Sequence, residues 1–312
     1  MGTNSTDALV SVADFIRWAA SRFQAAGLNF GHGTDNALDE AAALVLGTLH
    51  LPPDLPSAYF DCRLTGAERD QLAERIAERI EARRPVPYIL GEAWFCGLAF
   101  ALDEDVLIPR SPIAELIEAG FAPWAQPDRL RRIADVGTGS GCIAIATALA
   151  LPDARIDALD NSPAALEHAR ANARRHGVTE RVRVQASDLL EALEPQPSLD
   201  LIVANPPYVS AAAMAALPPE YRHEPAAALA AGDDGLAVIR RLLPQAARRL
   251  TDSGLLIAEI GHGRAAFEAA FPSLPVTWLA FERGGEGVFV VDAITLREAF
   301  AEADAHRAGG VD

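Results

Sequence analysis

The spacing of hydrophobic residues divides the chain into a helical first part and a second part in which short apolar runs alternate with helices. In the first part, apolar side chains recur every three or four residues, as on the buried face of an amphipathic helix. Three stretches follow this spacing, near residues 10–23, 41–51 and 72–80. We therefore expect a helical amino-terminal domain over residues 1–85, with a role in substrate recognition.

The third helix has its own start and stop signals. The run Thr65-Gly-Ala-Glu68 is typical of a capping box, in which the threonine side chain accepts from the backbone and the glutamate reaches back. Pro85 ends the helical stretch. Strand and turn character then extends from Tyr88 to Val106 and is followed by a helix, so residues 86–122 are expected to form a linker of hairpin and helix.

After Arg131 the pattern becomes that of a doubly wound α/β sheet. The last two strands are separated only by residues 282–287, too short for a crossover helix, which predicts an antiparallel hairpin. The predicted strands span 133–136, 155–159, 182–185, 201–204, 255–260, 276–281 and 288–292. Such a series predicts the class I S-adenosylmethionine-dependent methyltransferase fold, a Rossmann-like seven-stranded sheet, over residues 123–300. Residues 301–312 are expected to be a loose tail.

Composition limits the location of the protein and its chemistry. Half of the 312 residues are hydrophobic, which is typical of a globular chain. No run approaches the roughly 20 apolar residues that span a bilayer, and the start lacks an export signal, so a cytoplasmic protein without membrane contact is expected. Cys62, Cys96 and Cys142 lack metal-ligand spacing and are interpreted as small buried thiols, so no metal site is predicted.

Charge narrows the range of partners. The net charge is −16, and all 27 basic residues are arginines. These arginines are scattered and do not form the runs that follow a phosphate backbone, so direct binding of nucleic acid is not expected. A basic protein is a better partner, because opposite fields steer encounter. The sequence leaves the oligomeric state open.

A glycine-rich loop marks the expected cofactor site, where Asp135-Val136-Gly137-Thr138-Gly139-Ser140-Gly141 follows the first strand of the sheet. Glycines let backbone N–H groups and a helix start approach a ligand closely. A dinucleotide fingerprint needs Gly or Ala at its sixth position, where this chain has Cys142. Asp135 suits the cationic sulfonium and amino group of S-adenosylmethionine better than a pyrophosphate, so S-adenosylmethionine is the predicted cofactor. Its expected contacts here are Asp135, Gly137, Thr138, Gly139, Ser140 and Gly141.

Two further carboxylates follow the next strands. Asp160 ends the second strand, where it can accept both ribose hydroxyls. Asp188 follows the third strand and is expected to meet the adenine edge, with Leu189 packing on the ring. As purely structural residues, both carboxylates would serve turns or helix caps. Their position at the carboxyl ends of strands, where such sheets bind ligands, favours the binding role.

The most specific motif is Asn205-Pro206-Pro207-Tyr208, the NPPY turn, which follows the fourth strand. An amide nitrogen is a weak nucleophile because its lone pair is delocalised, so its N–H bonds must be held while the lone pair is aimed. The prolines remove competing N–H donors, Asn205 offers an acceptor, and Tyr208 offers a face for a planar amide. Positioning of this kind can lower the activation barrier by roughly 7–11 kcal/mol. The alternative is a proline-rich turn that only caps the next segment.

The combination of DVGTGSG, ALDNSP, SDLL and NPPY resembles the bacterial N(5)-glutamine methyltransferase family over essentially the whole chain. The resemblance implies an enzyme that transfers a methyl group from S-adenosylmethionine to the side-chain amide nitrogen of a protein glutamine. It implies that the amide is held by the catalytic residues Asn205, Pro206, Pro207 and Tyr208. It implies cofactor contacts from Gly137 to Gly141 and from Asp160, Leu189 and Asn205.

Other motifs separate two branches of this family. Pro109-Arg110-Ser111-Pro112 stands where the release-factor branch usually has Pro-Arg-Pro-(Asp/Glu)-Thr-Glu. Together with the runs at 93–97 and 220–225, it resembles the branch that methylates large-subunit ribosomal protein three, a basic substrate that suits an acidic surface. His223, Glu224 and Glu259 are interpreted as structural, since the reaction needs no strong base before transfer.

Three alternatives stay open at this point. The substrate could be a peptide chain release factor, since release factors also present a glutamine in a flexible loop. A DNA adenine amino-methyltransferase would share the glycine loop and the NPPY turn, but should carry a basic recognition region. A non-catalytic scaffold could keep the fold, although Asp160 and Asn205 would then have no reason to be intact.

Overall fold

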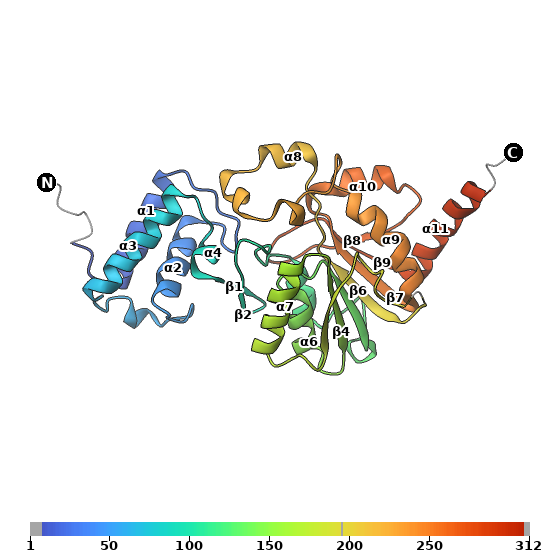
Figure 1. The fold of residues 1–312 in the computed structure, drawn as a ribbon, viewed down its shortest axis with the longest axis horizontal. Coiled ribbons are helices and arrows are strands. Elements are labelled where there is room, and N and C mark those ends of the chain that lie inside the picture. Colours follow the sequence, from blue (N-terminus) through green and yellow to red (C-terminus); the bar gives the residue numbers. More distant parts are fainter. Residues whose placement is uncertain (1–7, 195, 309–312) are drawn as a thin grey trace. The chain divides into compact units, whose positions relative to one another are not determined.

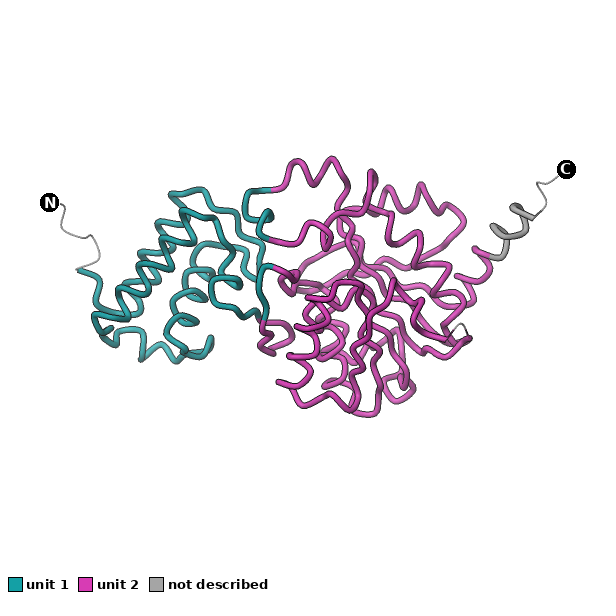
Figure 2. The backbone as a smooth tube through the Cα atoms, in the orientation of Figure 1, with its two compact units in different colours: residues 1–93, 102–104, 218–223 teal, residues 94–101, 105–217, 224–312 magenta. Residues whose placement is uncertain are grey.

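The computed structural model describes residues 8–194 and 196–308, which form two compact units (Figures 1 and 2). The first unit, teal in Figure 2, contains the described residues up to Ala93 with two short segments, Leu102–Glu104 and Pro218–His223. The second, magenta, contains Trp94–Ala101, Asp105–Leu217 and the described residues from Glu224 onward. Residues of the predicted linker, 86–122, divide between the two units.

The first unit is helical, as the apolar spacing predicts. Its helices are α1 (Val12–Ala25), α2 (Ala37–Thr48), α3 (Gly66–Glu81) and the short α4 (Val86–Leu90). Their apolar faces meet in one core in which Phe15, Phe23, Leu44 and Leu72 are fully buried. The predicted capping box opens α3: the Thr65 side chain accepts from the Glu68 N–H, and the Glu68 carboxylate accepts from the Thr65 N–H.

A buried ion-pair network joins a distant segment to this helical core. Arg79 of α3 is fully buried, and its Nε donates to Glu40 at 2.5 Å. Glu220, from the segment Pro218–His223, is also fully buried and accepts from Arg83 at 2.9 Å and from the Asn29 N–H at 3.0 Å. Arg79 Nη1 lies 3.7 Å from the same Glu220 oxygen. The segment after the NPPY turn is therefore held in the first unit by charge-assisted hydrogen bonds.

The second unit is built on a seven-stranded sheet with the order β5-β4-β3-β6-β7-β9-β8. The strands are β3 (Arg132–Val136), β4 (Arg155–Asp160), β5 (Val182–Ala186), β6 (Leu199–Ala204), β7 (Leu250–Glu259), β8 (Thr277–Trp278) and β9 (Val288–Asp292). The first five strands of that order are parallel, and β9 is antiparallel to both β7 and β8. The predicted Rossmann-like sheet with an antiparallel final hairpin is confirmed.

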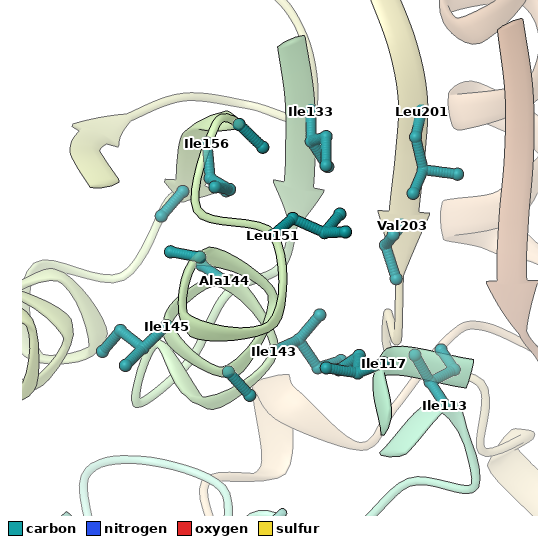
Figure 3. Close-up of a cluster of buried hydrophobic side chains, with 14 of the residues drawn as sticks. Ile113, Ile117, Ile133, Ile143, Ala144, Ile145, Leu151, Ile156, Leu201 and Val203 are labelled. Carbon is teal, nitrogen blue, oxygen red and sulfur yellow. The ribbon is translucent and has the colours of Figure 1, made fainter. Parts of the chain in front are cut away.

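Helices cover both faces of the sheet (Figure 1). Strand side chains alternate between faces, so Ile133 of β3 and Leu201 of β6 pack on one side, and Ala134 and Ile202 on the other. Figure 3 shows the first cluster, with Ile117 of α5 beside Ile143 of α6, and with Ile133, Leu201 and Val203 on the strands. One face carries α5 (Ile113–Glu118), α6 (Cys142–Ala150) and α7 (Pro163–Arg175); the other carries α9 (Ala237–Arg249), α10 (Arg264–Ala270) and α11 (Ala293–Ala308).

Smaller elements complete the chain. The predicted hairpin is present as β1 (Glu92–Phe95) and β2 (Leu98–Ala101), and α8 (Ala211–Ala216) follows the NPPY turn. Single-turn helices lie at Ser57–Tyr59, Pro127–Arg129, Pro219–His223, Ala226–Ala228 and Gly261–Gly263. In the part of the chain that the structure describes, no helix has both the length and the apolar character to cross a bilayer.

Two expectations about the end of the chain are corrected. The strand predicted over 276–281 is reduced to β8, because this edge strand pairs with β9 only at Thr277 and Trp278. Residues 301–308, expected to begin a loose tail, continue helix α11. Four of these eight residues are alanine, the strongest helix former. Residues 309–312 of the predicted tail lie outside the described residues.

Loss of the Glu220 carboxylate should destabilise the helical unit. Glu220→Ala leaves the Asn29 N–H and part of the buried arginine charge without an acceptor, so we expect a loss of about 3–5 kcal/mol. Urea unfolding of the full chain, followed by helical circular dichroism, measures this loss. The matched control is Glu104→Ala, which removes a half-exposed partner of Arg84 and should cost about 1 kcal/mol or less. Equal losses for both variants would contradict this prediction.

Candidate active site

The predicted site residues gather around one cavity of the second unit, with a volume of about 250 Å³. The cavity lies beyond the carboxyl ends of β3, β4, β5 and β6, since Val136, Asp160, Ser187 and Asn205 all contribute to its wall. The strand order reverses between β3 and β6, which is where open α/β sheets bind their ligands. Of the predicted residues, Gly137, Thr138, Gly139, Ser140, Asp160, Asp188, Leu189, Asn205, Pro206 and Pro207 line it.

The glycine loop, Gly137–Gly141, brings its backbone close to the NPPY turn. Gly137 has a φ of +74°, and a Cβ added there would lie 3.8 Å from the Asn205 carbonyl oxygen. Gly141 serves a different purpose and does not line the cavity. Gly141 has a φ of +83°, and an added Cβ would lie 3.0 Å from Ile145 of α6 and 3.2 Å from Ala169 of α7. The absence of a Cβ therefore allows the start of α6 to pack closely against α7.

Asp135, which the sequence predicts as a cofactor contact, lies behind the glycine loop. Asp135 is 1% exposed and is not among the residues that line the cavity. Its Oδ2 accepts from Thr138 Oγ1 at 2.6 Å and from the Ala144 N–H at 3.0 Å. Asp135 therefore anchors the glycine loop to the start of α6 from behind. Burial raises the pKa of this carboxyl from 3.8 to about 7.

Asp160 both shapes the loop and faces the cavity. Its Oδ2 accepts from the Gly139 N–H at 2.9 Å, and its Oδ1 accepts from the Ser162 N–H at 2.8 Å. Burial raises the pKa of this carboxyl, and the hydrogen bonds from the backbone oppose the rise. The structural and binding roles that the sequence left as alternatives can thus coexist at Asp160, because a carboxylate offers about four lone-pair sites.

Asp188 and Leu189 form another part of the wall. One oxygen of Asp188 pairs with Arg241 of α9 at 2.6 Å. Leu189 has a φ of +55°, a left-handed conformation that is unusual for a residue other than glycine. Such conformations cluster at ligand sites, where the surrounding structure holds them in place. Both residues therefore lie where the sequence predicts them.

The NPPY turn contributes to the large cavity and to a smaller adjoining one of about 20 Å³. Asn205 and Pro206 line both cavities, whereas Tyr208 lines only the smaller. The Asn205 Nδ2 donates to the Arg110 carbonyl oxygen at 3.3 Å, so its Oδ1 is the atom with acceptor capacity. The turn therefore borders the same cavity as the glycine loop, and its role in holding an amide stays a prediction.

A third wall segment, Leu107–Ser111, was not predicted. Its Arg110 forms a two-point salt bridge with Glu224, with both N···O distances at 2.6 Å. Glu224 is buried and also accepts from the Ile108 N–H at 3.3 Å. Its carboxylate thus holds the segment in place, which agrees with the structural interpretation of Glu224. The motifs containing Arg110 and Glu224 were visible in the sequence, but no local pattern indicates that they pair.

His223 does not contribute to the cavity. It belongs to the first unit, where its Nε2 lies 2.9 Å from the Ala82 carbonyl oxygen and its Nδ1 lies 3.4 Å from Glu104. These contacts agree with a structural role for this histidine.

Comparison with known proteins identifies the fold and the family of the chain. Residues 123–262 match the family model described as methyltransferase small domain, which with the sheet order confirms the predicted fold class. Three relatives carry the name ribosomal protein uL3 glutamine methyltransferase. The Bordetella pertussis protein is 49% identical, over 89% of this chain and 94% of that protein. The Neisseria meningitidis protein is 47% identical, over 93% and 96%. The Burkholderia pseudomallei protein is 44% identical, over 94% and 98%.

The buried Asp135 should make stability depend on pH. Between about pH 4 and pH 7 the folded protein retains a proton that the unfolded chain has released, so folding stability falls as pH rises through this window. Asp135→Asn removes this titration, while its side-chain oxygen can still accept from Thr138 and Ala144. In urea unfolding without ligand, the free energy of unfolding of the variant should rise relative to that of the wild type from pH 4 to pH 7. A constant difference between the two proteins would contradict this assignment.

Proposed function

The chain belongs to the ribosomal protein uL3 glutamine methyltransferase family, and we propose that it transfers a methyl group from S-adenosylmethionine to the side-chain amide nitrogen of a glutamine in uL3. One observation carries the proposal: Asn205 and Pro206 line both a large cavity with a glycine loop and a small cavity with a tyrosine. A methyl donor in the first and an amide in the second would meet at this turn.

The large cavity fits S-adenosylmethionine. Asp160 can accept from the ribose hydroxyls, Asp188 from the adenine amine, and Leu189 can pack on the ring. The close approach of Gly137 to the NPPY turn leaves a cradle that a Cβ would narrow. The cavity volume of about 250 Å³ is near the lower end of the range of roughly 300–1,000 Å³ for small-molecule sites. When bound, this cofactor supplies an electrophilic methyl group on a sulfonium.

The small cavity presents the polar groups that a carboxamide needs. The Asn205 Oδ1 and a backbone carbonyl of the turn can accept the two amide N–H bonds, and the Tyr208 ring offers a flat face. An amide held in this way would direct its nitrogen lone pair toward a methyl donor in the large cavity. Among the described residues that line this cavity, none carries a carboxylate or an imidazole. Catalysis would therefore depend on positioning, and the nitrogen would lose its proton after alkylation has made that proton acidic.

Charge favours a basic protein substrate over DNA. The net charge of −16 opposes a phosphate backbone but attracts a basic ribosomal protein.

The test is direct transfer. The full chain is incubated with methyl-labelled S-adenosylmethionine and, separately, with free uL3, a peptide chain release factor and duplex DNA. We expect the label in uL3, on a glutamine that mass spectrometry identifies after proteolysis. Label in the release factor or in DNA but not in uL3 would overturn the proposed substrate.

Asn205→Ala should lower methylation of uL3 by about tenfold or more, because at least one buried hydrogen bond worth about 1–3 kcal/mol is lost. Cofactor affinity, measured by calorimetry, should stay close to that of the wild type. The matched variant is Asp160→Ala, which should instead weaken cofactor binding. Unchanged turnover in Asn205→Ala would remove the proposed role of this residue, and unchanged affinity in Asp160→Ala would remove the ribose contact.

A further inference from the structure

A buried carboxylate lies behind the NPPY turn. Glu259 ends strand β7 and is 5% exposed. Its Oε1 accepts from the Tyr208 hydroxyl at 3.0 Å, and its Oε2 accepts from Ser111 Oγ at 2.6 Å. Glu259 is not among the residues that line either cavity. It can therefore influence the amide site only through the groups that it holds.

The hydrogen bonds around Glu259 have a defined direction. Ser111 Oγ accepts from the Ile113 N–H at 3.2 Å, so its own proton is available for the carboxylate. The Tyr208 hydroxyl also donates to Glu259, which leaves the carboxylate as acceptor on both sides. This is the arrangement that an ionised carboxylate requires. Burial raises the pKa of Glu259, while these two hydrogen bonds and the charge of Arg110 oppose the rise.

Two glycines restrict Tyr208 from other directions. Gly261 lies against the ring, since an added Cβ would come within 2.7 Å of Cε2. Gly235 lies against the Tyr208 backbone, where an added Cβ would come within 2.4 Å of the carbonyl oxygen. With its backbone, ring face and hydroxyl all engaged, Tyr208 is held in place, and the hydroxyl contact fixes where the end of the ring lies.

We propose that Glu259 is a positioning residue for methyl transfer, which holds the Tyr208 ring as a fixed wall of the amide site through the tyrosine hydroxyl. This inference rests on the proposed function, because the wall matters only if a planar amide lies against it. A side chain free to swing about its Cα–Cβ bond would place this wall in several positions, and only some of them would aim the nitrogen lone pair at the methyl group. Removal of the acceptor should therefore lower the turnover number more than the affinity for either substrate.

The first test needs neither substrate nor cofactor. The sequence has four tyrosines, so the full chain labelled with ¹³C-tyrosine gives few ring signals, and Tyr208→Phe assigns the one of interest. Glu259→Met removes both acceptor oxygens at similar volume and should shift the Tyr208 signals while the other tyrosines keep theirs. Unchanged Tyr208 signals would overturn the proposal whatever the protein methylates.

The second test is a double-mutant cycle on uL3 methylation. Glu259→Met should lower kcat by about tenfold with cofactor affinity within about twofold of the wild type, as expected for loss of one buried hydrogen bond. Glu259→Gln keeps one acceptor oxygen and should recover part of that loss. In the Tyr208→Phe background, Glu259→Met should lower kcat by less than about twofold further. If the loss of kcat in the double variant equalled the product of the two single losses, Glu259 would not act through Tyr208.

Two comparisons keep the outcomes separate. Glu268→Met, an exposed carboxylate on α10, is the matched control and should leave activity and the Tyr208 signals unchanged. If Glu259→Met does not fold, Glu259→Gln and Tyr208→Phe take its place, and both must lower kcat for the proposal to stand. A wild-type chain that fails to label uL3 would refute the proposed function alone, since the tyrosine signals still decide the role of Glu259.

Discussion

The site depends on the register between two neighbouring parallel strands. β3 and β6 pair so that Val136 lies opposite Ala204, the last residue of each strand. The segments that follow, the glycine loop and the NPPY turn, therefore leave the sheet side by side at the same edge. Gly137, whose positive φ favours glycine, lies beside this turn, where an added Cβ would be 3.8 Å from the Asn205 carbonyl oxygen. A shift of this register by one residue would separate the donor and acceptor sites and turn the strand side chains to the wrong faces.

The sequence predicts the parts of the site that depend on local pattern. Strands, their ends and the motifs after them are periodic or consecutive features, so the places of Asp160, Leu189 and Asn205 could be inferred without coordinates. The role of Asp135 could not, because a carboxylate beside a glycine loop can face either the ligand or the helix behind it. Only the positions of Thr138 and Ala144 show that it faces the helix. The limits of β8 likewise depend on pairing across the sheet.

Long-range pairing explains the remaining gap between sequence and structure. Arg110 and Glu224 form a two-point salt bridge that shapes the cavity wall, but each lies in a motif with no local sign of its partner. Glu220 is similar: as a charged residue between a proline and a tyrosine it resembles a solvated loop position, yet it is fully buried with arginine partners in the helical unit. Charged residues are rarely buried without such partners, so burial could not be inferred before the partners were known.

Two buried carboxylates, Glu224 and Glu259, lie behind a site whose proposed chemistry needs no base. A buried ion pair or carboxylate is a poor source of stability, since well-packed apolar groups often do as well or better. These carboxylates fix the orientation of their partners: the Arg110 guanidinium and the Tyr208 hydroxyl each donate hydrogen bonds to a buried carboxylate. An amide nitrogen reacts only when its lone pair is aimed, so a site of this kind gains more from rigid walls than from a stronger base. The cost of burying charge behind the NPPY turn is thus better explained by orientation than by folding stability.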